Sequence, residues 1–337
     1  MTYRPPCTVT PVIECLLGEI CEMVGRLSMP VAWERPMLRR INRIRTIQGS
    51  LAIEGNTLSE EQITAIMDGK RIVAPPREIQ EARNAIEVYD RLEQWDPYRE
   101  NDLLAAHEIM MRGVMDLPGR YRSGTVGVMG GDAIIHVAPP AGRVPLLMRD
   151  LFDWLAASER HPLVASSIFH YEFEFIHPFA DGNGRMGRFW QTLILLRWNP
   201  VFAVVPVESM VRACQREYYG ALNRSTGKGD SAPFVEFMLE VIRETLEDME
   251  SDQAGDQVSD QVKRLLRAMG VQFAAVPELM ADLSLSHRPT FRKNYLRPAL
   301  DAGLLEMKYP ENPKHPGQRY RLTPKGLSMK VRVTGRK

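Results

Sequence analysis

The residues best suited to chemistry in this 337-residue chain lie in one stretch, His177 to Arg188, which reads HPFADGNGRMGR. The ordinary pKa of a histidine such as His177 suits it to take a proton from a hydroxyl near neutral pH. Asp181 supplies a hard carboxylate oxygen, the ligand that magnesium prefers. Arg185 and Arg188 project from one side of the following turns and can hold phosphate oxygens in bidentate fashion. Together these residue types predict chemistry on a phosphate anhydride.

The glycines of this stretch indicate how phosphates are held. An apolar helix pattern ends near Ile176 and another helix begins near Gly184, so the residues between them should form a tight loop at a helix N-terminus. Gly182 and Gly184 let backbone N–H groups converge on phosphate oxygens, and the helix dipole adds positive potential. The chain has no G-x-x-x-x-G-K-[ST] sequence, which excludes a P-loop enzyme.

The stretch resembles the signature of the Fic (filamentation induced by cAMP) family, HPFx[DE]GNGRxxR, at all nine fixed positions. The resemblance covers roughly residues 38–246 and implies a mainly α fold, in which an all-helical core carries a short β-hairpin flap. It also implies a nucleotidyltransferase, specifically a protein adenylyltransferase. Such enzymes transfer AMP from ATP to a Ser, Thr or Tyr hydroxyl of a target protein, with Mg²⁺ as cofactor and pyrophosphate as the second product.

The resemblance assigns a role to each residue of the motif. His177 would deprotonate the target hydroxyl, and Asp181 would hold magnesium against the α- and β-phosphates. Asn183 and Arg185 would hold phosphate oxygens, while Arg188 would bind the γ-phosphate. The flap, around residues 128–131, would pin the target segment by strand pairing and lie over the nucleotide.

A second match lies upstream, where Ser50 to Asn56 (SLAIEGN) resembles the family's inhibitory motif, [ST]xxxE[GN]. Ser50 and Glu54 are four residues apart and would share a helix face, and the resemblance implies that the Glu54 carboxylate points into the site and pairs with Arg188. An Arg188 occupied by Glu54 cannot bind the γ-phosphate, which implies autoinhibition. In some relatives this glutamate also helps water to remove AMP from the target, and that alternative stays open.

A third similarity lies in Arg216 to Leu222 (REYYGAL), which is similar to the Tyr-Tyr-x-x-Leu element that closes the adenine pocket in the family. Tyr219 would stack on or line the base, and the alternative is that both tyrosines are half-buried helix aromatics. His170 is expected to be a packing residue. The residues implied to bind ATP are Glu54, Val128, Met129, Gly130, Gly131, Asp181, Gly182, Asn183, Gly184, Arg185, Met186, Gly187, Arg188, Tyr218 and Tyr219.

The elements that must position these residues are mostly helices. Apolar residues recur at helical spacing from Glu34 to Ile53, and Gly55-Asn56 ends that pattern. Ser59 and Gln62 are spaced as a capping box that begins the next helix. Similar patterns predict helices over 78–95, 102–115, 144–157, 163–176, 188–196, 207–222 and 233–249. Residues 125–128 and 133–137 form two short β runs around a Gly-rich turn.

Charge is unevenly distributed along the chain. The whole chain holds 43 Lys plus Arg against 42 Asp plus Glu, a net charge of +1. Residues 261–337 hold 16 basic and 5 acidic residues, a net charge of +11, which leaves −10 for the remainder. Residues 244–260 carry seven acids and no base, as an acidic helix end running into a linker would. The expected division is an N-terminal helical region with the inhibitory motif (1–100), a catalytic core (101–250), an acidic linker (251–260) and a basic domain (261–337).

The basic segment is predicted to contain helices over 258–269, 275–282 and 289–302, followed by strands at 303–307 and 320–323. Pro298 lies inside the third helix and puts its second half in doubt. This order resembles a winged helix-turn-helix domain, which commonly binds DNA, and the charge suits phosphate contacts. Docking to a protein is the alternative. The residues expected to contact DNA are Arg288, Arg292, Lys293, Arg297, Lys314 and Arg319.

Composition is that of an ordinary globular protein, with 44% hydrophobic residues and no apolar run long enough to span a bilayer. The start of the chain lacks the basic-then-apolar order of a secretory signal. Four cysteines without a close pair favour a reduced, cytoplasmic protein over a disulfide scaffold: Cys7, Cys15, Cys21 and Cys214. The expected partners are a target protein and DNA, without a membrane, and a homodimer is left open. Two other functions compete, namely AMP removal by the same site and DNA-binding regulation by a nucleotide-sensing core.

Overall fold

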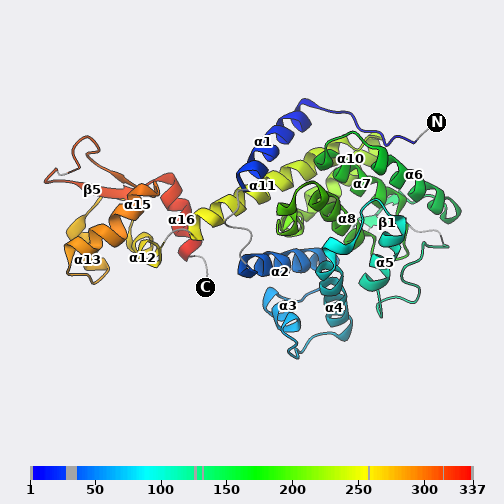
Figure 1. The fold of residues 1–337 in the computed structure, drawn as a ribbon, viewed down its shortest axis with the longest axis horizontal. Coiled ribbons are helices and arrows are strands. Elements are labelled where there is room, and N and C mark those ends of the chain that lie inside the picture. The colour runs from blue at the N-terminus through cyan, green and yellow to red at the C-terminus, as the bar shows by residue number, and fades with distance from the viewer. Residues whose placement is uncertain are drawn as a thin grey trace. The chain divides into compact units, whose positions relative to one another are not determined.

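The structure, a computed structural model, describes residues 3–27, 36–124, 127–130, 133–256, 259–313 and 315–334. The chain is mainly α, and Figure 1 shows its helices and small strands. It divides into two compact units, Met1–Met249 and Glu250–Lys337, with the division falling inside one helix, α11. Each unit has its own hydrophobic cluster, so each is described by itself.

The helices of the first unit are α1 (Pro11–Leu27), α2 (Pro36–Ile53), α3 (Glu60–Met67), α4 (Pro76–Asp90), α5 (Glu100–Met110), α6 (Val144–Ala157), α7 (Pro162–Ile176), α8 (Asn183–Trp198), α9 (Val207–Ala213), α10 (Gln215–Lys228) and α11 (Ala232–Asp256). Short 3-10 turns lie at η1 (Leu92–Gln94), η2 (Ala141–Arg143) and η3 (Pro200–Ala203). The predicted capping box at the start of α3 is confirmed, because the Ser59 and Gln62 side chains each accept from the other's backbone N–H.

Helices α7 and α8 form the centre of the first unit and pack against each other. Both are buried on almost all sides, and the large side chains Phe169, Phe173, Phe189 and Trp190 are fully buried. A helix that is apolar all round belongs inside a core. The residues between these helices, 177–182, are therefore a loop held at both ends by a rigid pair.

Helix α2, which carries Ser50 and Glu54, packs closely against α9. A Cβ added at Gly49 would lie 2.7 Å from the backbone nitrogen of Ser209 and 2.8 Å from the carbonyl carbon of Glu208, closer than real Cβ atoms come. Glycine therefore sets how near the two helices approach, since no side chain fits between them.

One expectation about a helix was wrong, and one helix was not predicted. The pattern over 207–222 predicted one helix, but the chain breaks at Cys214 (φ −107°, ψ 34°) into α9 and α10. The sequence analysis also missed α1. Its buried residues Ile13, Leu16, Ile20, Met23, Val24 and Leu27 recur at helical spacing, so the signal was present in the sequence.

The expected hairpin consists of β1 (Gly127–Gly130) and β2 (Ala133–Val137), which pair antiparallel. Gly127 lies opposite Val137 and Gly130 opposite Ala133, with an irregularity between Val128 and Met129. Val128, Met129 and Gly130 thus lie on β1, whereas Gly131 lies outside the described residues.

The second unit contains α12 (Asp260–Ala268), β3 (Ala274–Ala275), α13 (Val276–Asp282), α14 (Arg288–Phe291), the π-helical turn η4 (Arg292–Leu296), α15 (Arg297–Asp301), β4 (Leu305–Met307), β5 (Arg319–Leu322) and α16 (Pro324–Thr334). Its strands form a sheet in the order β3-β5-β4. Helical structure runs from Arg288 through Pro298 to Asp301, because the N–H of Arg297 bonds to the carbonyl of Arg292 in a π turn. The wider turn lets the helix pass a residue that has no N–H to donate.

Candidate active site

The loop between α7 and α8 is closed by one side chain. Asn183, at 2% exposure, accepts from the N–H of Phe179 through Oδ1 and donates to its carbonyl through Nδ2, each at 2.9 Å. Both ends of the amide are used within the loop. The side chain of Asn183 therefore shapes the loop, which differs from the phosphate contact expected from the resemblance.

His107, a buried residue that the sequence analysis missed, contacts the backbone of this loop. The Nδ1 atom of His107 accepts from the N–H of Gly119 (2.8 Å), so its Nε2 is the donor to the carbonyl of Asp181 (3.0 Å). Its ring stacks on Phe179 with centroids 3.6 Å apart. Burial lowers the pKa of His107 to about 4, so it stays neutral at physiological pH.

The N-terminus of α8 has the geometry of an anion site. Gly182, with a left-handed backbone (φ 84°), precedes the helix, and its N–H donates to the Asp181 carboxylate at 2.6 Å. The N–H groups of the first turn, beginning at Asn183, have no partner inside the helix. A Cβ at Gly184 would overlap the Glu54 carboxylate, so glycine here lets that carboxylate lie against the first turn of α8.

Two motif residues face inward instead. Met186 is fully buried in the core. A Cβ at Gly187 would lie 2.8 Å from Cδ2 of His170 and 2.9 Å from Oε1 of Glu174. Both residues therefore occupy packing positions on the inner side of α8.

Arg188 connects α8 to α2. Its Nη2 donates to Oε1 of Glu54 at 2.7 Å and to the carbonyl of Ser50 at 3.0 Å, and its Nε donates to Oγ of Ser50 at 3.2 Å. Arg188 is 3% exposed, whereas a third of the Glu54 side chain is accessible. Burial alone would lower the pKa of Arg188, but the Glu54 carboxylate outweighs it and keeps the pKa above its usual value. The two sequence matches thus meet in space.

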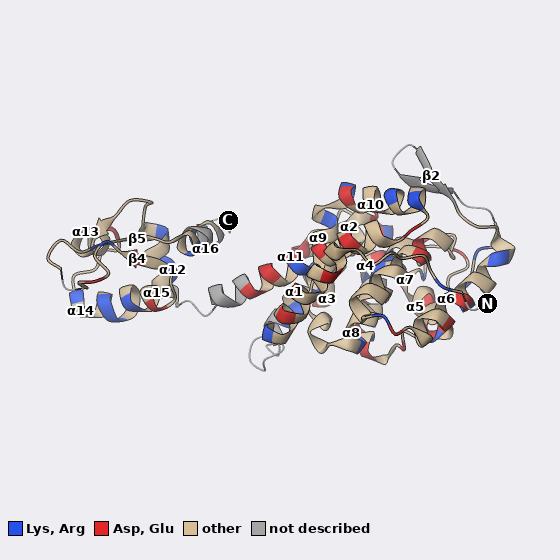
Figure 2. Cartoon of the chain, turned by 90° about the horizontal axis from the view of Figure 1, so that it is seen from above, with Lys and Arg blue, Asp and Glu red and all other residues tan. Residues whose placement is uncertain are grey.

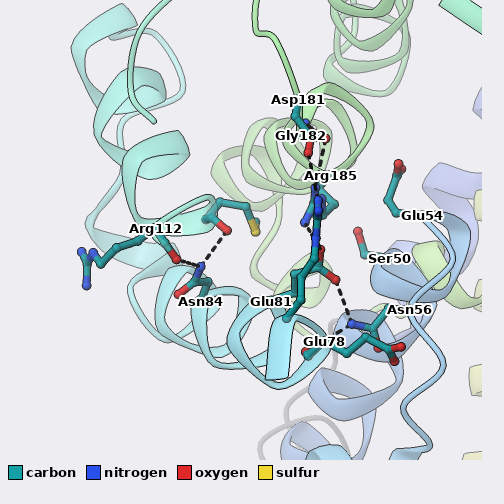
Figure 3. Close-up of polar contacts among 12 residues, drawn as sticks. Ser50, Glu54, Asn56, Glu78, Glu81, Asn84, Arg112, Asp181, Gly182 and Arg185 are labelled. Carbon is teal, nitrogen blue, oxygen red and sulfur yellow. Dashed lines mark hydrogen bonds and ion pairs between the residues drawn. The ribbon is translucent and has the colours of Figure 1, made fainter. Parts of the chain in front are cut away.

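Asp181 and Arg185 belong to a charged network with α4 (Figure 3). Arg185 lies 3.3 Å from Oδ1 of Asp181 and 3.7 Å from Oε1 of Glu81. Oε1 of Glu81 also lies 3.3 Å from Nε of Arg77, and Oε2 of Glu81 accepts from Nδ2 of Asn56 at 3.0 Å. Nη2 of Arg77 lies 3.4 Å from Oδ2 of Asp181. The Nε of Arg185 is buried and has no hydrogen-bond partner in the described part of the chain.

The residues present fit a magnesium ion that arrives with a nucleotide. The Asp181 side chain is 44% exposed and offers a carboxylate beside the anion site. Within the described residues there is no cluster of three or more His, Cys, Asp or Glu that could cage a metal. Magnesium commonly takes one or two carboxylates and completes its shell with water and phosphate oxygens, which this arrangement allows.

A buried polar layer lies behind the motif. As expected of a packing residue, His170 is fully buried, with Nδ1 2.7 Å from Oε1 of Gln191 and Nε2 3.1 Å from the Tyr218 hydroxyl. Tyr218 is 1% exposed and its ring packs against Phe234, so Tyr218 is a core residue. Tyr219 is half-buried and is the better placed of the two tyrosines to line a base.

Glu174 is a second residue that the sequence analysis missed. Its carboxylate lies 3.9 Å from Nδ1 of His177 and 3.9 Å from Nε2 of His170. Burial raises the pKa of Glu174 to about 8, which keeps the group mostly protonated at neutral pH. The site therefore holds a neutral acid directly behind the expected base.

The fold and the site define a mainly helical protein in which a histidine precedes a helix N-terminus and two arginines follow it, an arrangement suited to phosphate. The Fic/DOC family model matches residues 97–195, and that of the C-terminal domain of Filamentation induced by cAMP protein Fic-like matches residues 260–323. A Fic family protein from Desulfovibrio desulfuricans G20, known from a crystal structure, is 55% identical, with a TM-score of 0.72 over 96% of this chain and 99% of that chain. The chain belongs to the Fic family.

Curated relatives carry the name "Protein adenylyltransferase Fic". The protein from Nematostella vectensis is 29% identical over 245 residues, which are 68% of this chain and 55% of the relative. That from Drosophila willistoni is 29% identical over 59% of this chain and 40% of the relative. This chain thus spans about half the length of these relatives. Fic-1 from C. elegans, at 23% identity and a TM-score of 0.60 over 73% of this chain and 74% of that chain, shows the shared fold.

Proposed function

We propose that this chain is a protein adenylyltransferase that transfers AMP from ATP to a hydroxyl of a target protein. The observation that carries the proposal is the convergence of His177, Asp181, Arg185 and Arg188 around the N-terminus of α8. The names of the curated relatives support it as well. The target would be a protein with an accessible Ser, Thr or Tyr.

In the proposed reaction, the imidazole of His177 takes the proton of the target hydroxyl as its oxygen attacks the α-phosphorus. The bond from that phosphorus to the oxygen bridging to the β-phosphate breaks, and pyrophosphate leaves. Arg185 and the N–H groups of the first turn of α8 would bind phosphate oxygens. Mg²⁺ held at Asp181 would offset the negative charge of the α- and β-phosphates. Tyr219 would line the base, and the β1–β2 flap would hold the target segment by strand pairing.

We also propose that Glu54 inhibits this reaction. Its carboxylate occupies the Arg188 guanidinium that the γ-phosphate would need. With that arginine unavailable, ATP would bind without its α-phosphorus in line with the attacking oxygen. The contact of Ser50 with the same guanidinium supports a shared role for the two residues.

The test uses ATP labelled at either the α- or the γ-phosphate. Label from the α-phosphate should appear on the protein itself or on targets in a cell extract, increase in E54G, and disappear in E54G carrying His177→Ala. Label from the γ-phosphate would instead indicate kinase-type transfer and refute the assignment. Incubation of an AMP-modified target with wild type and E54G tests the alternative of AMP removal, which should require an intact Glu54.

A second candidate function, DNA binding by the basic segment, is favoured by one observation. Arg288, Arg292, Lys293 and Arg297 are all exposed along the continuous helical run α14–η4–α15, and Figure 2 shows Lys and Arg positions in blue along α14 and α15. Arg319, on β5, lies 3.7 Å from Glu278, and Lys314 lies outside the described residues. DNA affinity should fall steeply with salt concentration. R292A/R297A should reduce the slope of the logarithm of the binding constant against the logarithm of salt concentration by about two. Absence of binding at low salt would favour docking to a protein.

A further inference from the structure

Arg122 lies between α5 and β1 and is 6% exposed. Its guanidinium donates to four main-chain carbonyls. Nε bonds to the carbonyl of His177 at 2.7 Å, and Nη1 bonds to that of Gly124 at 2.8 Å. Nη2 bonds to the carbonyl of Pro139 at 2.5 Å and to that of Ile176 at 3.3 Å. One buried cation is thus satisfied by backbone oxygens from three separate segments.

These segments are functionally distinct. Ile176 and His177 are the end of α7 and the start of the active-site loop. Gly124 lies just before β1 and Pro139 just after β2, so these two residues are the two ends of the flap. The backbone N–H of Arg122 adds a further bond, to the carbonyl of Pro178 at 2.9 Å. Arg122 therefore ties both arms of the flap to the loop that carries the expected base.

The backbone at His177 explains why such a tie is needed. His177 has φ 50° and ψ 63°, a left-handed conformation that costs a non-glycine residue about 1 kcal/mol or more. Such a conformation persists only where surrounding contacts determine it. The carbonyls at the end of α7 also have no partner inside the helix and attract positive charge. The Arg122 guanidinium holds the left-handed backbone of His177 and also bonds the carbonyls at the end of α7.

We propose that Arg122 is a positioning residue that sets, through one side chain, both the backbone of His177 and the anchoring of the flap. The planar guanidinium is essential to this role, since a lysine ammonium cannot reach four carbonyls arranged around a fork. The statement that this positioning serves AMP transfer rests on the proposed function. The contacts of Arg122 with the flap and the loop do not rest on it, because they concern only how well these two segments are ordered.

The experiment compares R122K with R120A in full-length E54G. Arg120, two residues away and exposed, is the matched control for loss of a nearby positive charge. In R122K, kcat for transfer from ATP should fall about 100-fold, the effect of displacing a reacting group by roughly 1 Å, while the Kd of a fluorescent ATP analogue stays within about two-fold. Hydrogen exchange of peptides spanning 127–137 should accelerate at least ten-fold. R120A should match E54G in all three measurements.

Unchanged kcat together with unchanged flap exchange in a folded R122K overturns the proposal. If E54G itself shows no transfer, the proposed function fails, and flap exchange still decides the role of Arg122. If R122K does not fold by circular dichroism, R122Q, which keeps one amide donor, replaces it. Loss of fold in both variants also overturns the proposal, because Arg122 would then support the whole unit and not these two segments.

Discussion

At the scale of single residues, the site depends on which partner Arg188 holds. The buried guanidinium bonds the Glu54 carboxylate and both the side chain and the carbonyl of Ser50. A phosphate would have to displace the first of these contacts. The strength of inhibition should therefore follow the charge and reach of residue 54, with a smaller part from residue 50.

Substitutions at these two positions should activate AMP transfer in a graded order. Glu54→Gly removes the competing carboxylate and should raise transfer most. Glu54→Gln keeps the shape and loses the charge, and should raise it about ten-fold, since hydrogen bonds to charged groups contribute about 1.5–3 kcal/mol. Ser50→Ala leaves its carbonyl in place and should change transfer least. Initial rates with labelled ATP give the order, and a Glu54→Gln rate equal to wild type would contradict it.

His107 should make stability depend on pH. Its pKa is about 4 in the folded chain and near 6.5 when unfolded, so the unfolded state binds more protons between these values. The stabilisation is complete above pH 6.5 and is lost as pH falls toward 4, by about 3 kcal/mol. The difference in free energy of unfolding between wild type and His107→Gln should shrink by that amount between pH 7 and pH 4. A constant difference in urea titrations would show that His107 does not titrate.

At the scale of elements, helix packing positions the segment that carries Ser50 and Glu54. Gly49 allows α2 to approach α9, and the Ser209 hydroxyl donates to the carbonyl of Arg45 at 2.9 Å across the same contact. This places Ser50 and Glu54 opposite α8. The spacing of four residues put Ser50 and Glu54 on one helix face, but only this packing decides what that face meets.

Gly49→Ala should separate α2 from α9 and lower the free energy of unfolding by about 1–3 kcal/mol, the range for overpacking a close contact. Gly25→Ala is the matched control, because a Cβ there meets nothing within 4 Å and alanine favours a helix. The control should be neutral or stabilising by up to about 1 kcal/mol. Thermal melts of both variants provide the comparison, and equal melting temperatures would contradict the close approach.

Local signals predicted elements well where one segment decides its own conformation. The Ser59–Gln62 capping box is such a case, because its bonds lie within four residues. The break at Cys214 was not predicted, since the apolar spacing continues across it and only packing separates α9 from α10. Pro298 predicted a disturbed helix, and the actual response, a π turn that keeps the helix continuous, depends on surroundings that the sequence does not display.

At the scale of the whole molecule, the described residues form two hydrophobic clusters, one within residues 13–249 and one within residues 262–329. Phe291 is fully buried in the second cluster. Phe291→Ala should destabilise the second unit by about 3–5 kcal/mol. In E54G, adding Phe291→Ala should change the rate of AMP transfer by no more than about two-fold, because the expected catalytic residues all lie in the first unit. Hydrogen exchange by segment, measured with transfer rates, tests both statements, and a parallel loss of transfer would show that the units depend on each other.

The sequence alone predicted the chemistry, because the motif from His177 to Arg188 places the expected base, carboxylate and arginines within one turn-and-helix segment. It also predicted the charge division and most helices, which depend on local composition and spacing. The family resemblance predicted that Glu54 would meet Arg188, and only the tertiary structure decided which other distant groups meet that motif. The network through Glu81 and the bonds from Arg122 to the carbonyls of Ile176 and His177 join segments far apart in the chain. Such contacts depend on helix packing, for which neither spacing nor propensity carries a signal.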